Sequence, residues 1–171
     1  MNLTRYGNKS VISAIWDDDK MPYTEDGRRV DLLLNLLAII NRTTAAPLYE
    51  MLMNGSAYQI RQEMSKKKTL EEKEELLFDF VSIFNEDQEA SMHKDYRKLK
   101  KAEKEAYIQQ AIDEGIYIHW NPMWEKVPIF YRCQNLFRKY PFIKPVHTYI
   151  NKWGRPYKML NDYFIGEMYV L

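Results

Sequence analysis

The stretch TLEEKEELLFDFVSIF, residues 69–84, decides the fold of the middle of the chain. Its apolar side chains recur at helical spacing and share one face: Leu76, Leu77, Phe80, Val81 and Phe84. Thr69 and Glu72 have the spacing of a capping box, in which a hydroxyl and a carboxylate each accept a backbone N–H. The stretch therefore predicts an amphipathic helix that buries one face.

Residues 86–114 contain no glycine or proline, and the sequence predicts one long helix that ends at Gly115. Its apolar positions are sparse, whereas cations cover its middle: Lys94, Arg97, Lys98, Lys100, Lys101 and Lys104. A charge run of this kind is usually a solvated helix face. The alternative is a basic strip that lies against nucleic acid or an acidic partner.

On both sides of this polar region the sequence becomes strand-like. Strands are predicted where β-branched and aromatic residues gather, at residues 10–16, 116–120, 145–150 and 162–171. A helix is predicted over residues 43–53 with Pro47 in its first turn, and Asp26-Gly27 predicts a tight turn. Residues 30–40 form a long apolar run whose pattern fits either a strand or a helix.

Composition excludes several classes of protein. The chain has 171 residues, and its 25 Lys and Arg balance its 24 Asp and Glu, so bulk charge does not hold it on nucleic acid. No window offers about 18 uncharged apolar residues, and no signal peptide is visible, so no membrane contact is expected. Cys133 is the single cysteine, which excludes an internal disulfide framework and indicates a soluble protein of a reducing compartment.

No catalytic constellation is visible from the residues alone. His93, His119 and His147 are far apart in the sequence, which gives a zinc site no support. Cys133 lies in an apolar helical stretch and is expected to be buried and inert. The three consecutive aspartates at 17–19 are expected to face water, and no glycine-rich phosphate loop exists.

Three N-terminal segments carry a resemblance to a known family. RYGNKSVIS, residues 5–13, resembles GRHGNKGVIS of the second-largest (β) subunit of multisubunit DNA-directed RNA polymerases. MPYTEDGRRVD, residues 21–31, is similar to that subunit's MPYxEDGxPVDI, and LNLLAIINR, residues 34–42, is similar to LNPLGVPSR. The three matches follow one another in the family's order.

The other end of the chain resembles the same subunit less closely. YINKWGRPY and IGEMYVL, residues 149–157 and 165–171, are similar to LYDGRTGEPF and VTVGYMYMLKL. The resemblance implies an α+β fold, namely part of a double-psi β-barrel with a helical insertion and a strand-rich C-terminal segment. It divides the chain into an active-centre barrel segment at 1–54, a helical insertion at 55–115 and a strand-rich segment at 116–171 that rejoins the barrel and hybrid-binding region.

The resemblance also implies roles for particular residues. Arg42 matches the family arginine that contacts the triphosphate of the incoming nucleotide. Lys9 matches a family lysine that contacts phosphates of the initiating nucleotide or of the RNA 3′ end. Arg5, Asn8 and Asn41 are secondary candidates. The family's Mg²⁺ is held by a β′-like partner subunit, and nothing in this chain matches that metal motif.

The departures from the family pattern are numerous: Tyr6, Ser10, Leu36, Ile40, residues 43–47, and Met1 where a further lysine is usual. Such divergence resembles the split polymerases of large bacteriophages. The chain is then expected in the infected bacterial cytoplasm or in the virion, assembled with β-like and β′-like subunits, template DNA, nascent RNA and nucleoside triphosphates. Two alternatives are a non-catalytic β-like protein that regulates a host polymerase, and a helical scaffold whose flanks match by coincidence.

Overall fold

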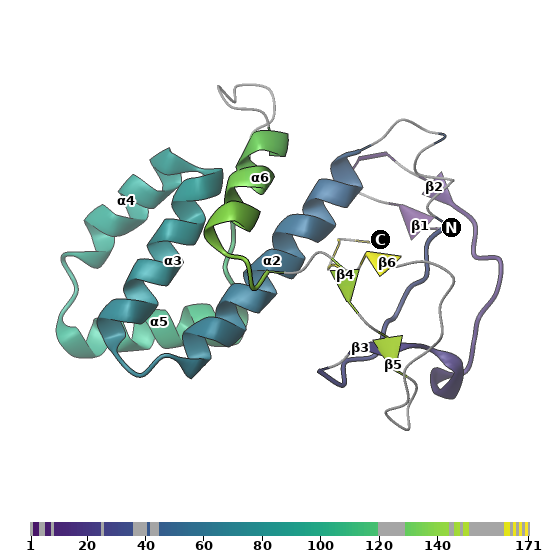
Figure 1. Cartoon of the computed structure of the whole chain (residues 1–171), viewed down its shortest axis with the longest axis horizontal. Helices are drawn as coiled ribbons and strands as arrows, with labels where there is room; N and C mark the ends of the chain where they lie inside the picture. The colour runs from purple at the N-terminus through teal and green to yellow at the C-terminus, as the bar shows by residue number, and fades with distance from the viewer. Residues whose placement is uncertain are drawn as a thin grey trace. The chain divides into compact units, whose positions relative to one another are not determined.

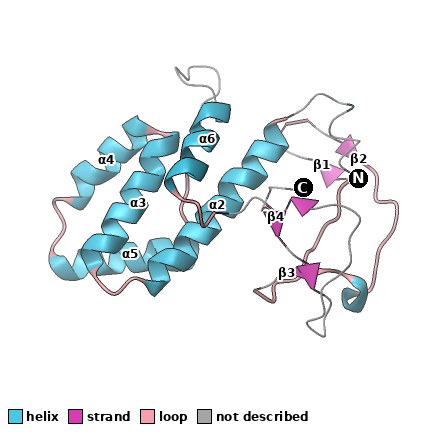
Figure 2. Cartoon of the chain, viewed as in Figure 1, coloured by secondary structure: helices cyan, strands magenta, loops and turns pink. Residues whose placement is uncertain are grey.

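The computed structural model describes residues 2–3, 6–7, 9–24, 26–35, 41, 45–119, 129–143, 146–147, 149–150, 163–164, 166, 168 and 170. The chain divides into two compact units (Figure 1). The first consists of Met1–Gly55 and Lys144–Leu171, and the second is Ser56–Ile143. Short strands belong to the first unit, whereas the second is built from helices (Figure 2).

The second unit is organised around α3, Leu70–Phe84, which packs against α4, α5 and α6. These neighbours are Glu86–Tyr96, Lys101–Glu114 and Ile129–Lys139, and the unit also takes in most of α2, Ala46–Lys66. Its core consists of side chains at most 2% exposed: Ile60, Met64, Leu77, Phe80, Val81, Phe84, Ile108 and Leu136. The predicted amphipathic helix is confirmed, and the Thr69 hydroxyl accepts the Glu72 amide at 3.4 Å.

The single helix predicted over residues 86–114 is wrong, because the chain turns at residues 97–100. The Glu103 carboxylate accepts the backbone N–H of Lys100 at 2.7 Å and so caps the start of α5. The turn brings the rings of Tyr96 and Tyr107 to 5.4 Å from each other. Two short helices bury their sparse apolar residues against α3, which one long helix cannot do.

The strand predicted at residues 116–120 is also wrong over 116–119, and Trp120 lies outside the described residues. The side chain of Gln88, not a neighbouring strand among the described residues, makes hydrogen bonds to the backbone of this segment. The amide group of Gln88 donates to the Tyr117 carbonyl at 2.7 Å and accepts the His119 N–H at 2.8 Å. Gly115 ends α5 with a φ of 126°, as its position predicted.

Pairs of two-residue strands hold the first unit together. β1 (Asn2–Leu3) pairs antiparallel with β2 (Lys9–Ser10). β3 (Tyr23–Thr24) pairs antiparallel with β5 (Tyr149–Ile150). β4 (Val146–His147) pairs antiparallel with β6 (Tyr163–Phe164). The third predicted strand, 145–150, is therefore found in its described part. The strand predicted at 10–16 is wrong beyond Ser10, because residues 11–17 pair with no described strand.

Two further expectations for the first unit have mixed outcomes. α2 begins at Ala46 with Pro47 in its first turn, as predicted, but it continues to Lys66 instead of ending near residue 53. Of residues 162–171, only β6 is a described strand.

Gly166 lies so close to α2 that a β-carbon added there would overlap the backbone of Met51, so this position needs glycine. No helix in the described part of the chain is long and apolar enough to cross a membrane.

Phe80 tests whether α3 organises the helical unit. Its side chain is 0% exposed, and its ring lies 5.5 Å from that of Phe84. We expect Phe80→Ala to lower the free energy of unfolding by about 3–5 kcal/mol, because a large cavity replaces the ring. Urea denaturation followed by far-UV circular dichroism measures this. The control Tyr131→Ala removes a 54% exposed ring on α6 and is expected to cost less than about 1 kcal/mol. Equal losses in the two variants would contradict the assignment of the core.

Candidate functional site

The segment from Pro22 to Val30 folds back on itself around Thr24. The Gly27 N–H donates to the Thr24 carbonyl at 2.9 Å, and the Val30 N–H donates to the Pro22 carbonyl at 3.0 Å. Gly27 has a φ of 81°, which confirms the tight turn predicted at Asp26-Gly27. The Thr24 hydroxyl, in a side chain only 5% exposed, bonds both the N–H and the carbonyl of Arg28.

This turn is joined to the C-terminal part of the same unit. Tyr23 pairs with Ile150, and Thr24 pairs with Tyr149. The buried Thr24 therefore sits at a junction between segments from the two ends of the sequence. Both segments carry the polymerase resemblance, and the strand pairing brings them together.

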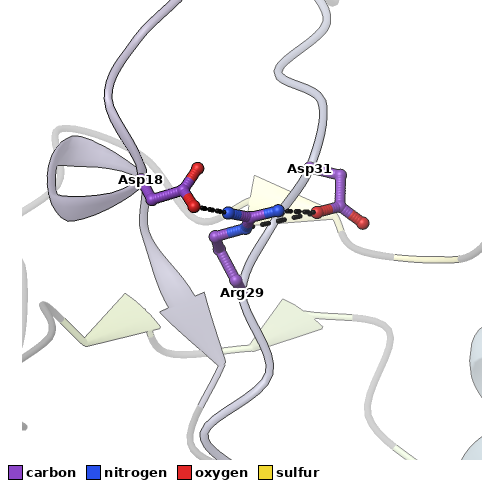
Figure 3. A network of polar contacts seen from close by, with 3 residues as sticks. All are labelled: Asp18, Arg29 and Asp31. Atoms are coloured by element: carbon purple, nitrogen blue, oxygen red, sulfur yellow. Dashed lines mark hydrogen bonds and ion pairs between the residues drawn. The ribbon is translucent and has the colours of Figure 1, made fainter.

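An arginine ties the turn to the preceding loop. The Arg29 guanidinium lies between two carboxylates, contacting Asp18 on one side and donating to Asp31 at 3.1 and 3.3 Å on the other (Figure 3). The hydrogen bond to Asp31 and the charge of Asp18 raise the pKa of Arg29. The sequence analysis did not predict this cluster. Arg29 and Asp31 are two residues apart, and this short separation was the one sequence signal of their contact.

Of the five predicted site residues, two lie among the described residues. Lys9 is exposed on β2 and pairs there with Leu3 across the hairpin, in which Gly7 has a φ of 75°. Asn41 is exposed. Arg5, Asn8 and Arg42 lie outside the described residues, so the predicted meeting of Lys9 and Arg42 stays a prediction.

Apolar side chains are exposed along the loops between these strands. Val11 and Ile15 are 87% and 89% exposed, and Ile12 and Trp16 are more than half exposed. A second run, at residues 32–34, consists of three leucines that are each 39–45% exposed. An apolar surface of this kind is typical of a region that another chain covers.

The described residues do not form a metal site. No group of three His, Cys, Asp or Glu among them has the geometry to hold a metal ion. Asp18 and Asp31 come close to each other, but the Arg29 guanidinium stands between them. The described residues therefore do not fit the Mg²⁺ that the resemblance implies for the assembled polymerase.

The helical unit holds the cysteine and three tyrosines whose pKa values are shifted, among them Tyr107, whose pKa is raised by burial and by the charge of Asp95. Cys133 is 5% exposed, and burial raises the pKa of its thiol from 9.0 to about 11. Burial and the hydrogen bond to Glu74 raise the pKa of Tyr96. Burial, the charge of Asp79 and the hydrogen bond to it raise the pKa of Tyr140. The prediction that Cys133 is buried is confirmed, and a buried thiol with a raised pKa is a poor nucleophile.

Comparison with known proteins agrees with the resemblance. A sequence profile of the family described as RNA polymerase Rpb2, domain 6, matches residues 3–117. The match includes Lys9, the turn around Thr24 and most of the helical unit. The middle of the chain, for which sequence reasoning found no counterpart, thus falls largely within the family's match.

Several curated relatives are named DNA-directed RNA polymerase subunit beta. One from Sorangium cellulosum is 29% identical over 119 residues, which cover 67% of this chain and 8% of the relative. One from Carsonella ruddii is 39% identical over 66 residues, covering 39% of this chain and 5% of the relative. One from Euglena longa is 43% identical over 58 residues, covering 34% and 5%. The chain thus spans less than a tenth of the length of these relatives.

The thiol of Cys133, together with the buried tyrosines whose pKa values are raised, gives a pH test of the helical unit. Between pH 9.0 and about 11 an unfolded thiol has lost its proton whereas the folded one retains it. Because the unfolded state then binds fewer protons, the free energy of unfolding falls as the pH rises through this range.

At about pH 8 we also expect iodoacetamide to alkylate Cys133 in the native chain at least about 100-fold more slowly than in guanidinium, because the thiolate is rarer and covered in the folded state. Equal alkylation rates would show that Cys133 is accessible.

Proposed function

Because the chain belongs to the family of RNA polymerase Rpb2, domain 6, we propose that it forms a β-like wall of the active centre of a multisubunit DNA-directed RNA polymerase. The observation that carries this proposal is the pairing of β3 with β5. It unites in one unit the two ends of the chain that resemble the β subunit. A helical scaffold with chance similarity at its flanks has no reason to pair those particular segments.

The chemistry proposed for this wall is recognition of phosphate. In RNA synthesis the 3′ hydroxyl attacks the α-phosphorus of a nucleoside triphosphate, and pyrophosphate leaves. Fixed cations favour this step by neutralising charge on the phosphate oxygens. Arg42 is proposed to grip the triphosphate with two parallel hydrogen bonds, and Lys9 to place a point charge near the initiating nucleotide or the RNA 3′ end. Arg5, Asn8 and Asn41 are proposed to assist them.

The exposure of Lys9 within its own hairpin supports this proposal. Lys9 is exposed on β2, close to the Gly7 turn. β2 is only two residues long, and apolar residues follow it immediately in the exposed loop. We propose that other polymerase chains cover this loop and complete a double-psi β-barrel. Mg²⁺ would then be bound by the β′-like partner.

The departures from the family pattern support a divergent polymerase, and we propose a viral, split-subunit one of the kind found in large bacteriophages. The second candidate function is a β-like protein that regulates a host polymerase without taking part in catalysis. The loss of the family's glycine at Ser10, of its prolines at Leu36 and Ile40, of the glutamine within residues 43–47 and of its lysine at Met1 favours this alternative. The retention of both Lys9 and Arg42 favours the catalytic assembly.

Arg42 tests the proposed grip on the triphosphate. In the assembled polymerase we expect Arg42→Ala to raise the KM for all four nucleotides and to lower kcat, at a cost of about 2–4 kcal/mol of transition-state stabilisation. Arg42→Lys is expected to recover only part of the loss, because an ammonium cannot make paired contacts. Nucleotide titration on a preformed RNA–DNA scaffold measures this. A change confined to one base would contradict phosphate recognition, because phosphates carry no sequence information.

Lys9 is expected to matter most before an RNA–DNA hybrid exists. Lys9→Ala should slow initiation several-fold more than elongation, because only the initiating nucleotide lacks a hybrid that holds it in place. The matched control Lys68→Ala removes an exposed lysine from the loop between α2 and α3 and is expected to change neither rate. If Lys9→Ala and Arg42→Ala both transcribe like the parent at limiting nucleotide, the regulator becomes the better interpretation.

A further inference from the structure

A pocket of about 270 Å³ opens in the helical unit, and nothing in polymerase chemistry accounts for it. It lies between α4, α5 and the extended segment from Gly115 to His119. Its apolar lining comes from all of these elements and from α3: Leu77, Met92, Ala111 and Ile116. Polar groups from Gln88, Gln110, Glu114 and His119 complete the lining.

Hydrogen bonds and ring contacts hold the pocket open. Tyr107, which lines the pocket, contacts the ring of Tyr96, and the Lys104 ammonium lies 5.0 Å from the centre of that second ring. Gln88 makes its two hydrogen bonds to the 115–119 segment. Asn85 donates to the His119 carbonyl at 2.6 Å. Both α4 and α5 are fixed by their packing on α3, so a ligand would find the site already formed.

The Glu114 carboxylate is the acidic group in the described lining of the pocket, and further carboxylates lie beside lining residues at two helix ends. The first turn of α4 carries Glu86, Asp87 and Glu89 on either side of Gln88, and the last turn of α5 carries Asp113 and Glu114. Among the described residues, no Lys or Arg lines the pocket. Arg61 comes near its edge, but its guanidinium is bound to the carbonyls of Ile112 and Asp113 at the end of α5, both at 2.7 Å. The lysines and the arginine of this region lie in sequence at and around the turn that joins α4 to α5: Lys94, Arg97, Lys98, Lys100, Lys101 and Lys104.

We propose that this pocket binds a basic peptide segment of a partner protein, which inserts one large apolar side chain between α4 and α5. Lysine or arginine residues beside that side chain would face the carboxylates of the two helix ends. The ring of Tyr117, which is 71% exposed at the edge of the pocket, offers a surface on which such a cation can rest. A nucleic acid fits poorly, because its phosphates would meet the same carboxylates.

The test uses the full chain and a short fluorescent peptide with one Phe flanked by lysines. Fluorescence anisotropy measures its affinity, and the methyl resonance of ¹³C-labelled Met92 reports its position. We expect a saturable shift of Met92 and none of Met64, which is 0% exposed in the core. Replacing the peptide's Phe by Ala is expected to weaken binding about tenfold or more, because the apolar anchor is lost.

Variants of the chain separate the pocket from general charge attraction. Ala111→Phe should fill the pocket and abolish the shift. Glu114→Gln, at an exposed position, should weaken binding about two- to fivefold, whereas Glu105→Gln, exposed on α5 outside the pocket, should not change it. Three results would overturn the proposal: no saturable Met92 shift at millimolar peptide, equal binding of a peptide with glutamates in place of the lysines, or stronger binding of a single-stranded oligonucleotide at Met92. This test is independent of nucleotide binding by Lys9 and Arg42.

Discussion

The antiparallel pairing of Tyr23–Thr24 with Tyr149–Ile150 is the constraint on which the first unit depends. It joins a turn from the start of the chain to a strand from near its end. Alternate residues of a strand face opposite sides, so a slip of one residue would turn the buried Thr24, only 5% exposed, to the other side of the strand pair. The position of the two polymerase-like segments relative to each other therefore depends on this register, whereas the bonds of the turn and of the Arg29 cluster lie within residues 18–31.

The helical unit has a different physical basis. α3 buries one face against three other helices, and its periodic apolar residues made it predictable from the sequence alone. The turn at residues 97–100 was not predictable in this way, because no glycine or proline marks it. Its cap is a side-chain contact from Glu103, and its benefit comes from tertiary packing of Tyr96 and Tyr107. Gln88 escaped prediction for a related reason, since a side chain that replaces a strand leaves no periodic signal.

The candidate site was predictable only to the extent that the resemblance carried it. Lys9 and Arg42 have no local pattern that distinguishes them from surface cations. Arg29 and Asp31 lie within residues 21–31, which carry the resemblance, but Asp18 lies outside them, and its contact with Arg29 needs the chain to fold back. The exposed run from Val11 to Trp16 has the composition of a strand but pairs with no described strand, and a covering partner would explain both properties. Local sequence thus indicates the propensity of a segment to form a strand, whereas strand pairing depends on whether another strand lies beside that segment.

The most direct test of the central claim is affinity labelling of the assembled polymerase with an initiating nucleotide whose 5′ phosphate carries an aldehyde. Borohydride reduction attaches the nucleotide to any lysine amine within reach, and extension by one radioactive nucleotide reveals only the molecules bound productively. Our account predicts label on Lys9 of this chain, and its loss in Lys9→Arg, which keeps the positive charge but forms no stable adduct. Label confined to other chains of an active enzyme would contradict the proposal that this chain forms a wall of the active centre.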